Sequence, residues 1–223
     1  MKRMNSIILV LLALVQLTAC SKKGNDTAPP PDNKSGTEKV DNLVGSFMGK
    51  NNVTGMSLAI TKNGKLVYAK GYGFADKQTG QRVDTSTLFR ISSISKTVTA
   101  TAIMKLVEEG KLSLDDKIFG DGAILGHDFG TQPYKQYITD LTVKHCLSHH
   151  VGGWGNASND PTMVNQAMSA NQLISWILNN RPLDVAPGTT YAYSNVGFMI
   201  LGRVIEKVTG LSYEQYVKQH ILT

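Results

Sequence analysis

The stretch FRISSISKTVTATAIMKLVEEGKLSLDDKI, residues 89–118, carries the clearest structural pattern in the chain. Its apolar residues recur at the three- and four-residue spacing of one helix face, at Val98, Ala102, Ile103, Leu106 and Val107. Gly110 follows this run, as is typical of the residue that ends a helix. The pattern predicts a helix from about Ser93 to Glu109, preceded by a short buried segment from Phe89 to Ile91.

Ser93 and Lys96 stand at the start of this helix in the pattern S-x-x-K. A serine hydroxyl is a weak nucleophile that needs a base, and a lysine one helical turn further lies on the same face. Burial and the positive end of the helix dipole both destabilise the charged amine, which favours its use as a base. Free N–H groups in the first turn favour an oxyanion. Taken alone, the tetrapeptide is better explained by a serine cap and a solvated lysine.

A second polar pattern, Tyr193-Ser194-Asn195, precedes another apolar run. A tyrosine hydroxyl near a cation loses its proton more easily and can pass a proton between a nucleophile and a leaving group. The Asn195 amide offers a donor and an acceptor, so it can hold a substrate amide or orient the lysine. Core packing of Tyr193 and helix capping by Asn195 are the simpler explanations of the tripeptide alone.

Together and in this order, the motifs resemble those of the class C β-lactamase and DD-peptidase family, within the serine β-lactamase and penicillin-binding-protein superfamily. The resemblance covers about residues 40–223. Besides residues 89–118 it rests on MSLAITKNGKLVYAKGYGFAD (56–76), LTVKHCLSHHVGG (141–153) and PGTTYAYSNVGFMILGRVIEKVTG (187–210).

The resemblance implies an α/β fold, with an antiparallel sheet flanked by helices and a helical subdomain. It also implies an acyl-enzyme mechanism. Ser93 attacks a carbonyl, Lys96 and Tyr193 move protons, and Asn195 binds the substrate and the lysine. The Y-x-N form, rather than S-D-N, points to class C-like enzymes, peptidases and esterases. No cofactor is implied, and we expect a monomer.

The acyl substrate stays open among a β-lactam, a D-alanyl peptide of peptidoglycan and an ester. A non-catalytic penicillin-binding or sensor module on the same fold is the main alternative, because a fold alone does not fix turnover.

Two departures from the family pattern stand out. The usual H-T-S-G reads His149-His150-Val151-Gly152, which puts the fit of this loop in doubt. The third motif, K-T-G or H-x-G on a late strand, is absent, and Lys207-Val208-Thr209-Gly210 does not replace it because it has an extra residue and ends a helix. We expect the C-terminal strands to be missing, so that the chain is a truncated sequence or natural fragment lacking most activity.

The first residues resemble the signal peptide of a bacterial lipoprotein. Lys2 and Arg3 precede an apolar run too short to span a bilayer, and a small residue precedes Cys20. The resemblance implies cleavage after residue 19, lipidation of Cys20, and anchoring of an exported protein to a membrane, facing the periplasm or cell surface. Residues 20–38 are polar and proline-rich, so we expect a disordered tether before a domain at 39–223.

The remaining elements follow from periodicity and turn residues. We predict helices at about 38–49, 142–149, 171–180, 195–209 and 212–222, and one opened by Pro161 behind Asp160. Strands at 55–62 and 65–74 flank Asn63-Gly64, a strong hairpin signal. Gly71-Tyr72-Gly73 is interpreted as part of a bulged strand and not as a dinucleotide loop, because no helix follows it.

Two other classes of function receive little support. His145, Cys146, His149 and His150 lie close together and offer zinc ligands, but H-E-x-x-H is absent, so we favour a buried cysteine and hydrogen-bonded histidines. The net charge of +6 falls to +4 without Lys2 and Arg3. No basic run interleaved with aromatics predicts a nucleic-acid partner.

Overall fold

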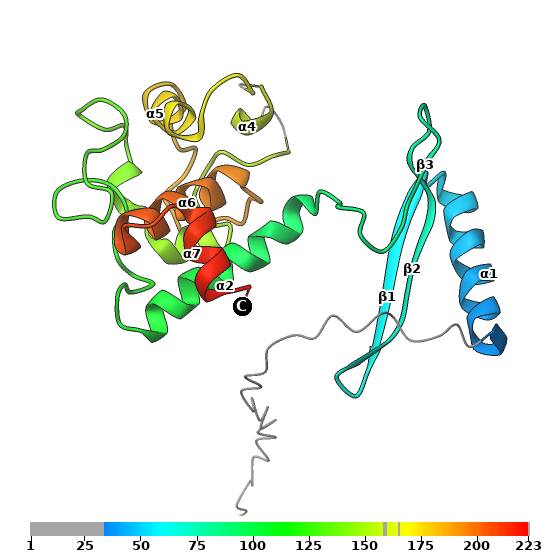
Figure 1. Ribbon diagram of the computed structural model, residues 1–223. Helices are drawn as coiled ribbons and strands as arrows, with labels where there is room; N and C mark the ends of the chain where they lie inside the picture. The colour runs from blue at the N-terminus through cyan, green and yellow to red at the C-terminus, as the bar shows by residue number, and fades with distance from the viewer. Residues whose placement is uncertain (1–33, 158–159, 165, 223) are drawn as a thin grey trace, which may run out of the picture. The chain divides into compact units, whose positions relative to one another are not determined.

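The computed structural model describes residues 34–157, 160–164 and 166–222, which form two compact units divided between Phe89 and Arg90 (Figure 1). The predicted signal peptide, Cys20 and most of the predicted tether lie outside the described residues. None of the helices in the described part of the chain is long and apolar enough to cross a bilayer.

In the first unit, helix α1 spans Lys34–Asn51 and therefore begins before the predicted position. Residues 34–38, which we expected to belong to the tether, are helical. Once an apolar helix face has nucleated, each added residue gains a backbone hydrogen bond, so a helix extends into neighbouring polar residues. Amino-acid composition alone does not predict that the helix extends into residues 34–38.

The hairpin is confirmed. Strands β1, Gly55–Lys62, and β2, Lys65–Asp76, pair antiparallel. Asn63 and Gly64 have φ angles of 52° and 71°, as the tight turn requires. A third strand, β3, comprises only Gln81–Arg82 and extends the sheet in the order β1-β2-β3. Two residues are too few for a periodic signal, which explains why the sequence did not predict β3.

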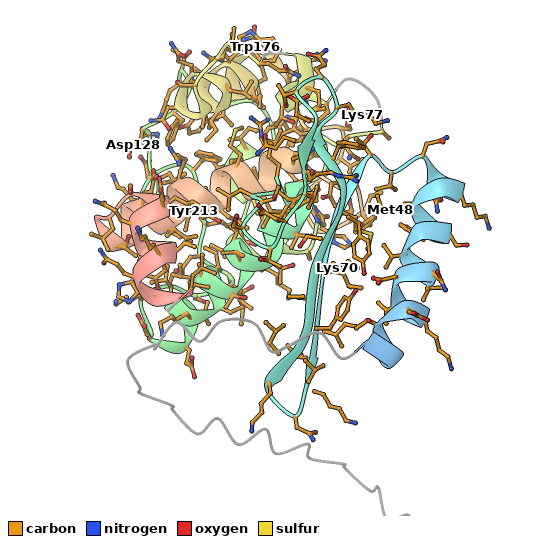
Figure 2. All side chains as sticks on the ribbon, turned by 45° about the vertical axis from the view of Figure 1, so that its right-hand side comes forward. Met48, Lys70, Lys77, Asp128, Trp176 and Tyr213 are labelled. Carbon is orange, nitrogen blue, oxygen red and sulfur yellow. The ribbon has the colours of Figure 1, made fainter. Side chains whose placement is uncertain are left out.

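Helix α1 is tied to the sheet through Asp41. Side chains alternate between the two faces of a strand, so Tyr68, Lys70 and Tyr72 lie on one face of β2. The two phenols each donate to Asp41 Oδ1 at 2.7 Å, and Lys70 Nζ lies 2.9 Å from Oδ2. Lys70 and the two phenols lower the pKa of Asp41 to about 2. Figure 2 shows side chains of α1, including Met48, between the helix and the sheet.

The second unit is helical. A 3-10 turn at Ser92–Ile94 precedes α2, Ser95–Glu108, and another occupies Ile138–Asp140. The further helices are α3 (Val143–Leu147), α4 (Pro161–Val164), α5 (Ala170–Asn180), α6 (Asn195–Thr209) and α7 (Tyr213–His220). These confirm the predicted helices to within a few residues, and Gly210 ends α6 with a φ of 70°.

Helix α6 lies at the centre of this unit and contacts α2, α3, α5 and α7 (Figure 1). Five of its apolar side chains have no exposed surface: Val196, Ile200, Leu201, Val204 and Ile205. Burying each such side chain stabilises the fold by roughly 1.5–3 kcal/mol. The first residue of this anchored helix is Asn195, so the core fixes one end of the predicted site.

The prediction that residues 89–91 are buried is wrong. Phe89 and Ile91 are 46% and 49% exposed. They belong to no strand or helix, and they lie where the chain passes from one unit to the other. Two apolar residues on either side of Arg90 are too short a pattern to distinguish an exposed connection from a core strand.

Candidate functional site

Ser93 is presented by a sharp turn rather than by the helix itself. It lies in the 3-10 turn Ser92–Ile94, and α2 begins two residues later. Ser92, in front of it, has a φ of 47°, a conformation that side-chain-bearing residues rarely adopt. The turn leaves Ser93 exposed, so its hydroxyl is open to a substrate.

The Ser93 hydroxyl lies between an amine and a phenol. Lys96 Nζ is 3.2 Å from Ser93 Oγ, and the Tyr193 hydroxyl is 2.9 Å from the same oxygen. Tyr193 comes from a position 100 residues later in the chain, just before α6. The structure therefore brings together the residues of the two motifs that the sequence singled out.

Lys96 is held by Asn195 and by two aromatic rings. Its Nζ donates to Asn195 Oδ1 at 2.7 Å and lies 5.0 Å and 5.7 Å from the ring centres of Tyr193 and Phe198. Across residues 34–157, 160–164 and 166–222, no carboxylate forms an ion pair with this amine. The hydrogen-bond partner of Lys96 is therefore the neutral Asn195 amide.

Tyr193 sits in an environment that favours its phenolate. Hydrogen bonding with Lys96, and then with Ser93, lowers the pKa of the Tyr193 hydroxyl. A phenol with a lowered pKa exchanges protons more readily near neutral pH. The position of Tyr193 thus suits proton transfer to or from Ser93.

His149 packs against the ring of Tyr193. The two rings stack with centres 4.4 Å apart, and His149 Nδ1 accepts the backbone N–H of Ser194 at 3.1 Å. Burial, and then the Lys96 charge, lower the pKa of His149 and favour the neutral ring that this acceptor role requires. The sequence left the fit of the H-H-V-G loop in doubt, and in the structure its first histidine packs directly against the site.

Asp160 contacts Asn195, and the sequence did not predict this contact. Its Oδ2 accepts Asn195 Nδ2 at 2.6 Å, and its side chain is almost fully buried. Its Oδ1 accepts the backbone N–H and the hydroxyl of Thr162, at 2.9 and 2.8 Å. The sequence signalled only the helix-capping role, because nothing in an Asp-Pro pair indicates a partner 35 residues away.

The residues considered as zinc ligands have other partners. The His145 ring forms a capping box with Thr142 at the start of α3. Cys146 is fully buried, and burial raises the pKa of its thiol to about 12, which disfavours the thiolate that binds metals. His149 Nδ1 accepts the Ser194 N–H.

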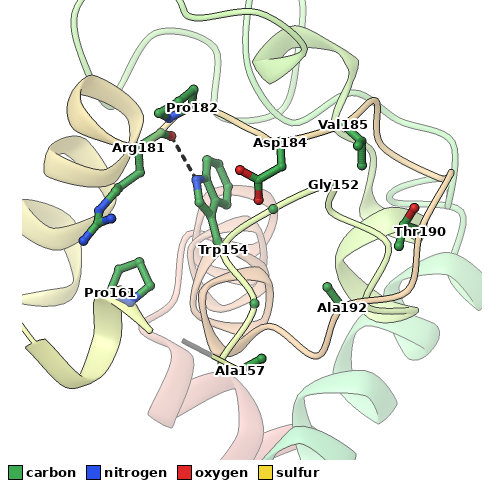
Figure 3. Close-up of a pocket in the computed structure, with 12 residues that line it drawn as sticks. Gly152, Trp154, Ala157, Pro161, Arg181, Pro182, Asp184, Val185, Thr190 and Ala192 are labelled. Carbon is green, nitrogen blue, oxygen red and sulfur yellow. Dashed lines mark hydrogen bonds between the residues drawn. The ribbon is translucent and has the colours of Figure 1, made fainter. Parts of the chain in front are cut away.

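A pocket of about 450 Å³ is lined in part by residues close to Tyr193 in the sequence (Figure 3). Its wall includes Thr190 and Ala192, while Trp154 is held by a hydrogen bond of 2.9 Å from Nε1 to the Arg181 carbonyl. Ser93, Lys96, Tyr193 and Asn195 are not among its lining residues. The lining of this pocket therefore does not include the site around Ser93. The two are close in the sequence at one point, because Pro161 of the lining directly follows Asp160.

Comparisons with known proteins agree with this geometry. A family model described as Beta-lactamase matches residues 40–223. The chain is 30% identical over 186 residues to Protein flp of Staphylococcus aureus strain MW2, covering 83% of the chain and 36% of that protein.

Two solved structures are similar in both sequence and fold. A penicillin-binding protein homologue from Pyrococcus abyssi is 33% identical with a TM-score of 0.65, covering 84% of this chain and 42% of that one. A class C beta-lactamase is 32% identical with a TM-score of 0.66, over 83% and 47% of the two chains. The chain spans less than half the length of each of these proteins.

Proposed function

Since the chain belongs to the beta-lactamase family and has that fold, we propose that it carries the nucleophile and the proton-transfer groups of a serine acyl hydrolase. One observation carries the proposal: Ser93 Oγ is hydrogen-bonded by both the Lys96 amine and the Tyr193 phenol. A nucleophile, a base within reach and a third group that orients the base form the usual arrangement for covalent catalysis.

The proposed reaction begins when Ser93 Oγ attacks a substrate carbonyl and its proton passes to the uncharged Lys96 amine or to the Tyr193 phenolate. The backbone N–H of Ser93 supports the oxyanion that forms. Tyr193 then gives a proton to the leaving group as the carbonyl–leaving-group bond breaks, which leaves an ester on Ser93. Water attacks the ester carbonyl and gives a proton to the same groups. The bond between Ser93 Oγ and the acyl carbon then breaks, Oγ receives that proton, and the acid leaves.

The proposed substrates are compounds with a reactive acyl group: a β-lactam, a D-alanyl peptide or an ester. Relatives described as a class C beta-lactamase and as a penicillin-binding protein homologue support the first two. The exposed position of Ser93 is compatible with all three.

Labelling of the purified chain with a fluorescent penicillin and a fluorophosphonate tests the proposal. We expect covalent label on Ser93, located by peptide mass spectrometry, and its loss in Ser93→Ala. Ser95→Ala is the matched control, because this neighbouring serine is exposed and takes no part in the hydrogen bonds that join Ser93, Lys96, Tyr193 and Asn195. It should label normally. No label with either probe would overturn the proposal. Stable label without release of product would favour the sensor-like alternative.

We further propose that the protein is exported and held at a membrane by lipid on Cys20. The support is the sequence alone, since this residue lies outside the described range. Metabolic labelling with an alkyne fatty acid in a bacterial host should mark the chain, and Cys20→Ala should abolish the label. A labelled Cys20→Ala variant would contradict the assignment.

A further inference from the structure

The Asn195 amide bridges two groups of opposite hydrogen-bonding character. On one side, 2.6 Å from Nδ2, is Oδ2 of Asp160, and an ionised carboxylate only accepts hydrogen bonds. On the other side, 2.7 Å from Oδ1, is Lys96 Nζ, which donates an N–H to this oxygen and, as an uncharged amine, keeps its lone pair for the proton of Ser93. An amide placed between these two groups satisfies both in one orientation and neither after a flip.

Asp160 is suited to impose this orientation because it is itself fixed. Its side chain is 5% exposed, and its Oδ1 is held by the N–H and the hydroxyl of Thr162. Within the described residues it forms no ion pair. Hydrogen bonds therefore stabilise the buried carboxylate, and the one on Oδ2 comes from the site.

We propose that Asp160 is a positioning residue of the Ser93 site, which holds the Asn195 amide so that its Oδ1 faces Lys96. The inference rests on the proposed function for its kinetic consequence, but not for its geometry. Without Asp160 the amide is free to turn its NH2 group toward the lysine. Lys96 then loses the acceptor that aligns its nitrogen with Ser93 Oγ.

The kinetic test measures the rate of acylation by a penicillin in a double-mutant cycle. Small misplacements of catalytic groups cost on the order of 100-fold in rate, so Asp160→Ala, which removes the acceptor of the Asn195 NH2, should slow acylation by about 10- to 100-fold. Because Asp160 acts through Asn195, Asp160→Ala made in an Asn195→Ala background should change the rate by less than about threefold. A full loss in both backgrounds would show that Asp160 matters for another reason and would overturn the proposal.

Thr162→Val is the matched control. It removes one hydrogen bond to Asp160 but leaves the Thr162 N–H and the Asp160–Asn195 contact in place. Because the Thr162 N–H still holds Oδ1, it should slow acylation clearly less than Asp160→Ala does. Equal losses in the two variants would mean that the carboxylate only supports α4, and the proposal would fail.

A second readout does not depend on activity. In the 15N spectrum of the native chain, the Asn195 side-chain NH2, assigned by its absence in Asn195→Ala, should exchange slowly with solvent. The protection should disappear in Asp160→Ala and persist in Thr162→Val. If the native chain takes up no probe, the proposed function fails while this measurement still decides the role of Asp160. Unchanged protection in Asp160→Ala would overturn that role.

Discussion

Tyr193 makes one contact through its hydroxyl and another through its ring, so a single substitution can test the hydroxyl without changing the packing of the ring. Its hydroxyl lies 2.9 Å from Ser93 Oγ, while its ring stacks on His149. Tyr193→Phe removes the first contact and keeps the second. General acid–base groups contribute about 10²- to 10⁴-fold to a rate, so we expect the acylation rate to fall by about that factor with little change in melting temperature. Stopped-flow measurement of penicillin acylation checks this.

Tyr191→Phe is the control for this prediction. Tyr191 also contacts the His149 ring, but it is 61% exposed and its hydroxyl reaches neither Ser93 nor Lys96. It should acylate at the native rate. A native rate in Tyr193→Phe would remove the phenol from the mechanism.

At the residue scale, the sequence predicted the groups whose chemistry is carried by short motifs. Ser93, Lys96, Tyr193 and Asn195 lie together as expected. Asp160 was missed because its role depends on a tertiary contact with α6, and the local pattern around it is fully explained by capping of α4. A side chain that acts through another residue leaves no motif of its own.

At the element scale, Ser194 connects the start of α6 to the site. Its Oγ accepts the Gly197 N–H at 3.2 Å and donates to the Trp154 carbonyl at 3.0 Å, and it is fully buried. Ser194→Ala removes a helix cap, at about 1 kcal/mol, and leaves a buried carbonyl without a partner, at about 1–3 kcal/mol. Urea unfolding should show a loss of roughly 2–4 kcal/mol.

The exposed cap of α7 provides the comparison. Ser212 accepts the Gln215 N–H at 3.2 Å in a capping box, but it has no buried carbonyl to satisfy. Ser212→Ala should therefore cost about 1 kcal/mol. Equal losses at the two positions would show that the contact with Trp154 adds nothing.

Alanine substitutions at two glycines of the hairpin should differ in their cost to stability, although the two glycines have the same φ angle. Gly64 and Gly73 both have a φ of 71°, but a side chain at Gly64 meets open space, whereas one at Gly73 overlaps the Thr54 carbonyl. Gly64→Ala should cost about 1–2 kcal/mol, from backbone strain alone. Gly73→Ala should cost clearly more, because a backbone atom cannot move away as a side chain can.

Far-UV circular dichroism and amide exchange of residues 55–76 measure this difference. Similar exchange in the two variants would mean that the backbone around Thr54 moves to accommodate the added side chain.

At the scale of elements, some helices and strands were predicted closely from the sequence and others were not. Long periodic helices such as α6 were predicted closely, while the two residues of β3 depend on pairing with β2 and left no pattern.

For the whole molecule, the division into two units follows from where apolar residues are buried. The second unit has one continuous core, formed by the helices around α6. Among the described residues of the first unit, residues 34–89, only Val44 and Val83 are buried apolar residues. Helix α1 and the hairpin leave others exposed: Leu43, Phe47, Ile60, Leu66 and Val67. A small sheet with so little buried apolar surface is marginally stable. The sequence predicted the elements of both units, but periodicity does not reveal how much of a face is covered.

The second unit carries two histidines that fold in their neutral forms, which gives its stability a pH dependence. His145 Nδ1 accepts the Thr142 N–H at 3.3 Å, and His149 Nδ1 accepts the Ser194 N–H at 3.1 Å. Burial is the main cause that lowers the pKa of both rings below the usual value of about 6.5. Between the folded and unfolded pKa values the unfolded chain therefore binds more protons than the folded chain.

The stability of this unit should be fully present above about pH 6.5 and should fall as the pH drops toward the folded pKa values. Urea midpoints measured between about pH 7.5 and pH 5 check the direction. His145→Gln is the informative variant, since glutamine at this third helical position keeps the capping box but does not titrate. It should match the native midpoint at the upper pH and lose less on acidification. Adding His149→Asn, whose Oδ1 can accept the Ser194 N–H, should flatten the dependence further. An unchanged slope in the double variant would mean that other groups set the acid sensitivity of the helical unit.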